Sequence, residues 1–218
     1  MKSFVALFLS IFVLISCSTN SEKDSDTPTL EFPLKVGNTW VFDIQGERSN
    51  RLDTLTVTKD TLIDGQTWFY LSEEEKNSHS LLNSSFQGYY TTYNSGLYHY
   101  SGESNISDNT PIFQANLTEG DTYLNDPGSV WITTYNGEES DSKYGSTYSY
   151  SVEYLTLLHN STTFDLDQSY IFERVYSPEI GFVHWETAYL TSPRKDTTIT
   201  LTLSERINIH LNEFIKAE

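Results

Sequence analysis

The stretch that decides the fold class is residues 197–211, which read TTITLTLSERINIHL. Its apolar side chains all fall on one parity, at Ile199, Leu201, Leu203, Ile207, Ile209 and Leu211. Successive side chains of a strand point to opposite faces of the sheet, so this period of two predicts a strand with one buried and one solvated face. Only Glu205 interrupts the apolar row.

Shorter runs with the same alternation fill the chain from Leu30 onward. They include residues 40–44 and 148–158, and turn residues separate them at Asp64-Gly65, Ser95-Gly96, Asn136-Gly137 and 178–181. Roughly ten strands spaced in this way predict an all-β domain, built as an antiparallel, partly open barrel or curved sheet. The one helical turn that we expect lies near the C-terminus, at residues 212–216.

The composition supports this fold class. With 218 residues, of which 37% are hydrophobic and 14% aromatic, the chain can bury one substantial core. Alanine, the best helix former, occurs only at Ala6, Ala115, Ala188 and Ala217. The 13 basic and 30 acidic residues give a net charge of −17. Binding to a nucleic-acid backbone requires clustered Lys and Arg, so we expect no nucleic-acid partner.

Residues 1–17 have the pattern of a targeting signal. Lys2 is followed by an apolar segment over residues 4–15, which is too short to span a bilayer comfortably. The segment ends in Leu14-Ile15-Ser16-Cys17, which resembles the lipobox of bacterial lipoproteins. That resemblance implies cleavage before Cys17 and a diacylglyceryl group on its thiol, with an acylated amino group. The alternative is an ordinary secretory signal with an incidental cysteine.

These features divide the chain into three parts. We expect a signal peptide at residues 1–16, a lipidated Cys17 with a flexible tether through residue 29, and one all-β domain over 30–218. Residues 18–29 read STNSEKDSDTPT and contain no large apolar side chain to bury. Cys17 is the only cysteine, so the domain can form no internal disulfide.

The tether also bears on localisation. A serine follows Cys17, which in lipoprotein sorting resembles an outer-membrane address, and the acidic residues of the tether are similar to the export tag of surface lipoproteins in Bacteroidota. We therefore expect a protein anchored in the outer membrane through the lipid on Cys17. Its periplasmic and surface faces both remain open.

The chain contains an internal echo. Residues 34–41, LKVGNTWV, are answered by residues 117–124, LTEGDTYL. Each copy places glycine and Asn or Asp in a tight turn and then begins a strand with an aromatic residue. The two copies are either a structural repeat or two hairpins that converged on one solution.

Residues 32–41, FPLKVGNTWV, resemble the PLxxGNxW start of the mature domain in Bacteroidota-type outer-membrane lipoproteins. A glycine-containing hairpin at 63–67, the echo at 120–123 and a P-x-I-G turn within 176–183 extend the resemblance to about residue 190. The resemblance implies an all-β, partly open barrel or curved sheet. It brings no activity with it.

Catalytic and metal-binding motifs are weak. The sequence has no G-x-S-x-G, H-E-x-x-H, P-loop or G-x-G-x-x-G motif. The histidines lack ligand spacing, and residues 165–169 begin like a calcium loop without its glycine or closing glutamate. We expect no metal and no cofactor. Glu173 and Glu186 are the one pair that glycosidase chemistry could use, but the adjacent Arg174 and His184 favour ion pairing.

Tyrosines are the remaining candidates for a binding surface. Alternate tyrosines on a strand form a flat platform for a sugar or peptide, or they pack across strands without a ligand. The tyrosines concerned are Tyr89, Tyr90, Tyr93, Tyr98, Tyr100, Tyr144, Tyr148, Tyr150 and Tyr154. The four tryptophans, Trp40, Trp68, Trp131 and Trp185, are expected in the core or at a barrel mouth.

The sequence thus favours a lipid-anchored, non-catalytic binding or interaction module, with a glycan, a peptide or a lipid as its ligand. Two alternatives stay open. One is a lipocalin-like carrier that holds a hydrophobic ligand in an apolar cavity. The other is an enzyme that acts on envelope polysaccharide. No ligand-binding residues can be named from the sequence.

Overall fold

The structure, a computed structural model, describes residues 32–46, 50–73, 81–102, 106, 109–124, 131–154, 157–159, 162–166, 170–191, 194–195 and 198–218. Cys17, the tether and the predicted domain boundary lie outside these residues. No helix in the described part of the chain is long and apolar enough to cross a membrane.

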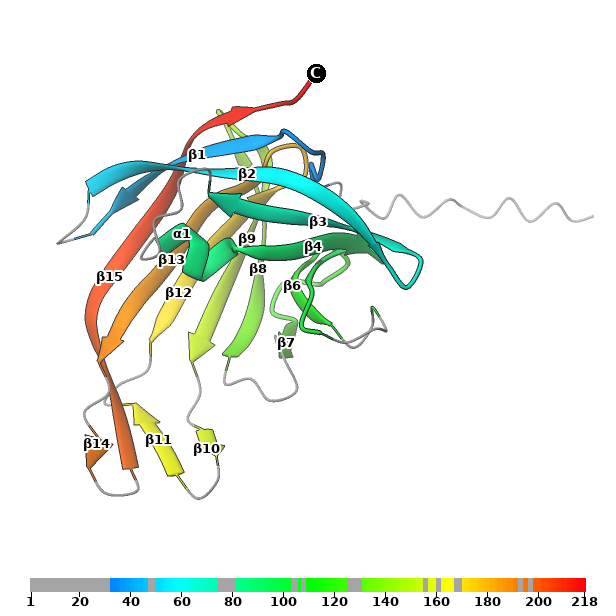
Figure 1. The fold of residues 1–218 in the computed structure, drawn as a ribbon. Coiled ribbons are helices and arrows are strands. Elements are labelled where there is room, and N and C mark those ends of the chain that lie inside the picture. The colour runs from blue at the N-terminus through cyan, green and yellow to red at the C-terminus, as the bar shows by residue number, and fades with distance from the viewer. Residues whose placement is uncertain are drawn as a thin grey trace, which may run out of the picture.

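The described residues form one curved antiparallel sheet made of two six-stranded meanders (Figure 1). The first meander is β1 (Thr39–Gln45), β2 (Asn50–Ile63), β3 (Gln66–Glu73), β4 (Gly88–Tyr93), β5 (Gly96–His99) and β6 (Thr110–Gln114). The second is β7 (Thr122–Leu124), β8 (Trp131–Asp141), β9 (Gly145–Tyr154), β12 (Ile171–Ser177), β13 (Gly181–Thr191) and β15 (Thr198–Ile215). Neighbours along each series are neighbours in the sheet, and β15 pairs with β1. The predicted all-β fold is confirmed.

Four short elements complete the fold. The helix α1 (Leu81–Phe86) connects β3 to β4, and three small strands extend the second meander at the bottom of Figure 1. Of these, β11 pairs with β10 and lies parallel to the start of β15, which also pairs with β14. Their bounds are β10 (Leu157–His159), β11 (Thr162–Leu166) and β14 (Arg194–Lys195).

The two free edges of the sheet, β6 and β7, approach each other. No ladder joins them among the described residues, but side-chain hydroxyls cross the gap. Tyr123 on β7 donates to the Ile112 carbonyl at 2.8 Å, and Tyr150 on β9 donates to the Gln114 carbonyl at 3.0 Å. The seam between β6 and β7 is thus bridged by side chains and has no backbone ladder among the described residues, so the barrel is partly open, as predicted.

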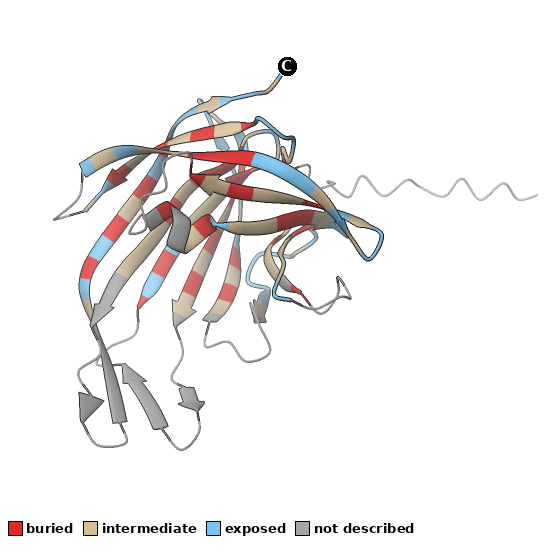
Figure 2. Cartoon of the chain, in the orientation of Figure 1, coloured by how far each residue is buried: buried red, intermediate tan, exposed pale blue. Residues whose placement is uncertain are grey.

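Aromatic side chains fill the concave side. Buried and less buried residues alternate along the strands (Figure 2), as a period of two requires. Phe86 of α1 packs in the middle, with its ring centroid 5.9 Å from Phe42 and 4.7 Å from Trp185. Phe113 and Phe182, from opposite meanders, are both almost fully buried in the same cluster. Tertiary packing of these rings therefore holds the two meanders together.

The internal echo is a structural repeat. In each copy one residue of the next strand makes two backbone bonds to the turn. Its carbonyl accepts from the glycine amide, and its amide donates to the carbonyl of the Asn or Asp that follows the glycine. Both glycines have positive φ, 94° at Gly37 and 90° at Gly120, which a side chain would disfavour. The two bonds measure 2.8 and 2.9 Å in each copy, through Gly37, Val57 and Asn38 and through Gly120, Tyr135 and Asp121.

Two local predictions are wrong. The expected helical turn at 212–216 is the end of β15, because Phe214 packs on Trp40 with ring centroids 5.4 Å apart and the strand stays paired with β1. Asn136-Gly137 is a bulge inside β8 and no turn, because the following residues stay paired with β9. By contrast, Asp64-Gly65 forms the expected hairpin turn, with φ of 48° and 85°.

The helix α1 is missing from the sequence prediction. Its six residues are fewer than a periodic apolar pattern needs to be recognised.

Candidate functional site

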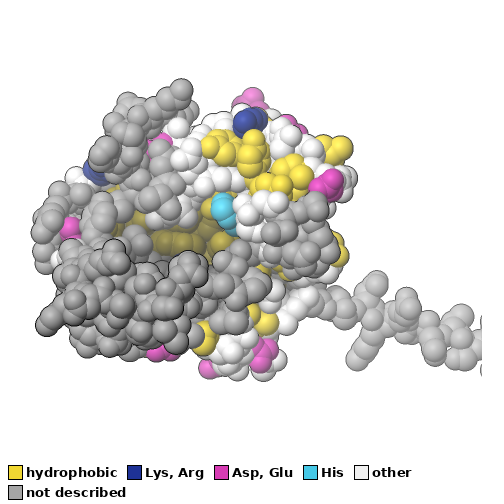
Figure 3. Space-filling model, turned by 60° about the horizontal axis from the view of Figure 1, so that its bottom comes forward, with side chains coloured by type: hydrophobic (Ala, Val, Ile, Leu, Met, Phe, Trp, Pro, Cys, Tyr) yellow, Lys and Arg dark blue, Asp and Glu magenta, His cyan; other side chains and the backbone are white. Residues whose placement is uncertain are grey.

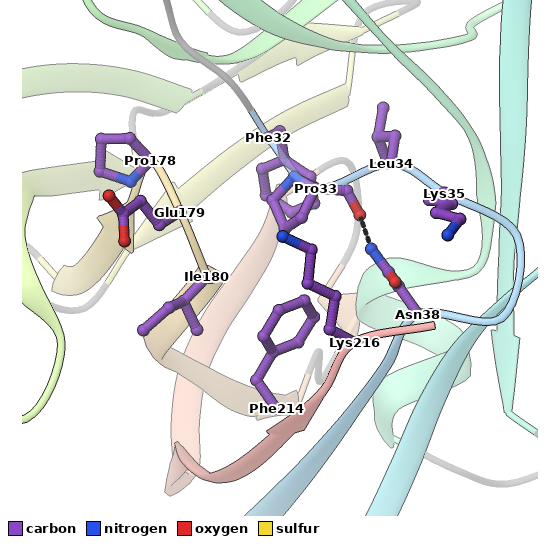
Figure 4. Close-up of a pocket in the computed structure, with 10 residues that line it drawn as sticks. All are labelled: Phe32, Pro33, Leu34, Lys35, Asn38, Pro178, Glu179, Ile180, Phe214 and Lys216. Atoms are coloured by element: carbon purple, nitrogen blue, oxygen red, sulfur yellow. Dashed lines mark hydrogen bonds between the residues drawn. The ribbon is translucent and has the colours of Figure 1, made fainter. Parts of the chain in front are cut away.

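Two recesses are candidates, and the first lies where the two ends of the described chain meet (Figure 4). It is wide and open, about 850 Å³, and its walls come from the N-terminal segment, the β12–β13 turn and the C-terminal residues. Trp40 donates its indole N–H to the Ile180 carbonyl at 2.5 Å, and Phe32 packs on Phe182 at 4.7 Å. A Cβ at Gly181 would lie 2.9 Å from the Phe32 ring, so this close approach requires glycine.

Polar groups of this recess already bind other parts of the chain. Asn38 donates its side-chain amide to the Pro33 carbonyl at 2.7 Å, and its Oδ1 accepts from the Ala217 amide at 2.8 Å. Lys35 donates to the carbonyls of Ala217 and Glu218. Two of the motifs quoted for the resemblance, within 32–41 and 176–183, therefore meet here in a structural clasp between the two ends of the described chain.

The second recess is a cavity of about 200 Å³ inside the curved sheet, between the two meanders. Viewed toward the lower end of Figure 1, the molecule is hollowed, with hydrophobic side chains in the hollow and a histidine beside them (Figure 3). The cavity is lined by residues of α1, β4, β5, β6, β12 and β13: Ser85, Phe86, Gln87, Tyr90, His99, Ile112, Arg174, Phe182 and Trp185.

Arg174 gives this cavity its chemical character. It lies on β12 with the parity of Phe172 and Tyr176, which are buried, so it faces inward while Glu173 faces outward. Its guanidinium carbon lies 3.8 Å from the centre of the Trp185 ring. Its Nε is buried without a hydrogen-bond partner, and no salt bridge joins Arg174 to any described residue.

Burial disfavours the charged form of this guanidinium and lowers the pKa of Arg174 to about 10, which leaves it protonated at neutral pH. Arg174 is not among the binding residues that the sequence predicts, because its neighbour Glu173 favours an ion pair with it. The available signal was strand parity, since Arg174 is a charge in an otherwise aromatic row.

The facing wall is polar but uncharged. The ring centroids of Tyr90 and His99 lie 5.0 Å apart. Burial lowers the pKa of His99, while a hydrogen bond with the Gln87 backbone raises it in part. Burial also raises the pKa of Tyr90, and the nearby Arg174 lowers it in part. Both side chains are therefore neutral at pH 7, and Arg174 is the one formal charge among the described residues that line the cavity.

The proposed carboxylate pair lies on the outer face of the sheet. Glu186 Oε2 accepts from Arg206 Nη1 at 3.0 Å and from the Glu173 amide at 2.9 Å. The Glu173 carboxylate lies 3.9 Å from His184, which stacks on His210 with ring centroids 4.3 Å apart. Both glutamates are engaged, but with partners other than those expected, since Glu186 pairs with Arg206 and Glu173 lies near His184. The expected pairing of Glu173 with Arg174 is wrong, because Arg174 faces inward.

The described residues contain no group of three or more His, Cys, Asp or Glu side chains that could hold a metal ion. His79 and residues 167–169 of the calcium-like segment lie outside the described residues, as does lipidation at Cys17.

The tyrosines do not form a single platform among the described side chains. Tyr90, Tyr148 and Tyr150 are buried in the core, whereas Tyr89 packs against Tyr70 with tilted rings, near Lys59 on the outside. The side chain of Tyr154 is not described. The tryptophans whose side chains the structure describes are buried as expected: Trp40, Trp68 and Trp185. The side chain of Trp131 lies outside the described ones.

Comparison with known proteins adds little to this geometry. No protein-family model matches the chain, and no curated protein matches it. Among solved structures, the chain is similar to a "putative lipoprotein" from Parabacteroides distasonis, with 13% sequence identity and a TM-score of 0.39. The match covers 86% of this chain and 99% of that one.

Proposed function

We propose that this chain is an outer-membrane lipoprotein, anchored through a lipid on Cys17, that binds a small ligand in the cavity between its two meanders without transforming it. The lipobox-like residues 14–17 support the anchor. The observation that supports binding is the cavity itself, where apolar walls surround a few inward-facing polar groups. That combination is typical of small-molecule sites.

The other two functions have less support. A carrier of a long acyl chain needs a large apolar cavity, but aromatic rings fill the concave side and leave about 200 Å³. Pockets for drug-sized ligands usually measure roughly 300–1,000 Å³. An enzyme acting on polysaccharide needs two carboxylates that face each other across a substrate. Glu173 and Glu186 are instead engaged on the outer face.

The anchor is tested by labelling cells that express the full chain with an alkyne-bearing palmitate. Because Cys17 is the only cysteine, no other thiol can accept the label. We expect a labelled wild-type protein in the outer-membrane fraction and an unlabelled Cys17→Ser variant. An unlabelled wild-type protein in the soluble fraction would contradict the anchor. Protease digestion of intact cells then decides between the surface and periplasmic faces.

Binding is tested by native mass spectrometry of the full chain, extracted from its host membranes in detergent. We expect an additional mass that is lost on denaturation. The matched variants alter Ser85, which lines the cavity from α1. Ser85→Trp should fill the space and abolish the additional mass, whereas Ser85→Ala should retain it. Equal retention by all three folded proteins would place the ligand elsewhere, and an apo wild-type spectrum would contradict the proposed function.

A further inference from the structure

We infer that the cavity ligand is a small organic anion, a carboxylate with a flat or compact apolar body, held by the Arg174 guanidinium. This inference rests on the proposed function, since it names the ligand class of the same site. Three features of the cavity carry it: its charge, the unmet hydrogen bond of Arg174 Nε and its size.

The charge of the cavity is positive and local. Arg174 is the one charged side chain among the described residues of its lining, although the chain as a whole carries a net charge of −17. An acidic protein has many carboxylates with which an arginine could pair, yet none forms a salt bridge with Arg174 in the described part of the chain. A buried charge without a counter-ion is costly, and a bound anion would remove that cost.

The orientation of the guanidinium suits a carboxylate. The guanidinium carbon lies over the Trp185 ring, 3.8 Å from the ring centre. The Nε–H donor of the same group is buried and has no acceptor. Arginine binds carboxylates through two parallel N–H···O bonds along one edge of its guanidinium.

The remaining walls select the body of the ligand. Phe86, Ile112 and Phe182 present apolar surface, and Ser85 and Gln87 lie at the same cavity. A volume of about 200 Å³ exceeds the roughly 150 Å³ of an apolar cavity that accepts a benzene ring. A benzoate-sized acid therefore fits, whereas an inorganic anion would leave the apolar walls without contacts.

The test compares benzoate with benzamide, which has a similar shape and no charge, by calorimetric titration of the full chain. We expect benzoate to bind roughly 10- to 100-fold more tightly, as a charge-assisted hydrogen bond predicts. Arg174→Met should abolish this preference, and Arg174→Lys should weaken it. Arg206→Met, which alters an arginine on the outer face, should keep it.

Thermal unfolding separates a ligand-binding arginine from a structural one. Since Arg174 has no carboxylate partner among the described residues, the ligand-free Arg174→Met variant should unfold at the same or a higher temperature than the wild type. A lower unfolding temperature together with an unchanged benzoate preference would show that Arg174 only supports Trp185, and would overturn the inference.

The outcomes also separate this inference from the proposed function. Equal binding of benzoate and benzamide, or a neutral ligand in the native mass spectrum, would overturn the anion and leave the binding function standing. Stronger binding of inorganic phosphate than of benzoate would overturn the organic carboxylate. No binding of either probe, together with an apo native mass spectrum, would remove both proposals.

Discussion

The two junctions between the meanders differ in how they are closed. At one junction, β1 pairs with β15 from Thr39↔Ile215 to Gln45↔Asn208, and the C-terminal residues bond to the turn that precedes β1. At the other, β6 and β7 are bridged by tyrosine hydroxyls without a ladder among the described residues. The first junction stabilises the domain, and the second lies beside the strands that line the cavity.

Trp40 and Tyr123 occupy equivalent positions in the two copies of the repeat, 34–41 and 117–124, so each reports on the stability of its own junction. Trp40 is fully buried at the paired junction. We expect Trp40→Ala to reduce the free energy of unfolding by about 3–5 kcal/mol, the usual cost of deleting a large buried ring. Tyr123→Phe at the seam removes one hydrogen bond and should cost about 1 kcal/mol. Urea unfolding measures both, and equal losses would contradict the asymmetry.

Asn38 and Asp121 form the second matched pair. Asn38 is 1% exposed and bonds to Pro33 and Ala217, whereas Asp121 is exposed and accepts from the nearby Thr118 amide. Asn38→Ala leaves buried polar groups without partners and should cost about 2 kcal/mol of unfolding free energy. Asp121→Ala leaves groups that water can reach, so it should cost less than about 1 kcal/mol of unfolding free energy, under half of the cost of Asn38→Ala. A reversed order in chemical denaturation would show that the clasp is not important for stability.

The two turn glycines give a smaller difference. Both have positive φ, so an alanine is strained at either position, by about 1 kcal/mol. At Gly37 the new Cβ would also lie 3.0 Å from Ala217, whereas at Gly120 nothing lies within 4 Å. Thermal denaturation should therefore show a lower unfolding temperature for Gly37→Ala than for Gly120→Ala. A lower unfolding temperature for Gly120→Ala would show that the contact between a Cβ at Gly37 and Ala217 does not destabilise the paired junction.

The smallest effect is a pH dependence next to the paired junction. Burial, and then the neighbouring His210, lower the pKa of His184, while Glu186 and a backbone bond to Ile209 raise it in part. The unfolded chain takes up this proton near pH 6.5, and the folded chain only at lower pH. Stability should therefore fall as the pH drops below about 6.5, until the lowered pKa of His184 is reached.

The control for this prediction is His184→Gln, which removes the titrating group. Unfolding temperatures measured at several pH values should show a smaller acid-dependent decrease in the variant than in the wild type. An unchanged slope would assign the acid sensitivity to groups other than His184.

Local features could be predicted from the sequence, and long-range ones could not. The alternation in 197–211 is sufficient to predict β15, and the echo of 34–41 in 117–124 is sufficient to predict two like turns, because both depend on residues close in sequence. The pairing of β1 with β15 depends instead on contacts across most of the chain, and β-bulges such as that at Gly137 depend on which residues the partner strand presents.

The candidate site follows the same division. The inward direction of Arg174 is implied by the parity of Phe172 and Tyr176. In the same way, the neighbours of Glu205 on β15 imply that Glu205 is buried. That Arg174 has no carboxylate partner among the described residues is not implied, because this depends on which strands face β12 across the interior. A short-range pattern therefore locates the charge on a face, and only the fold shows that the charge lines a cavity.

The most direct test of the central claim is an NMR spectrum of the arginine Nε–Hε groups. The chain has five arginines, Arg48, Arg51, Arg174, Arg194 and Arg206, and the signal that Arg174→Met removes identifies Arg174. We predict that benzoate shifts this signal and leaves the other four in place, while benzamide shifts none of them. An Arg174 signal that does not respond to benzoate, or five signals that move together, would contradict an anion site between the two meanders.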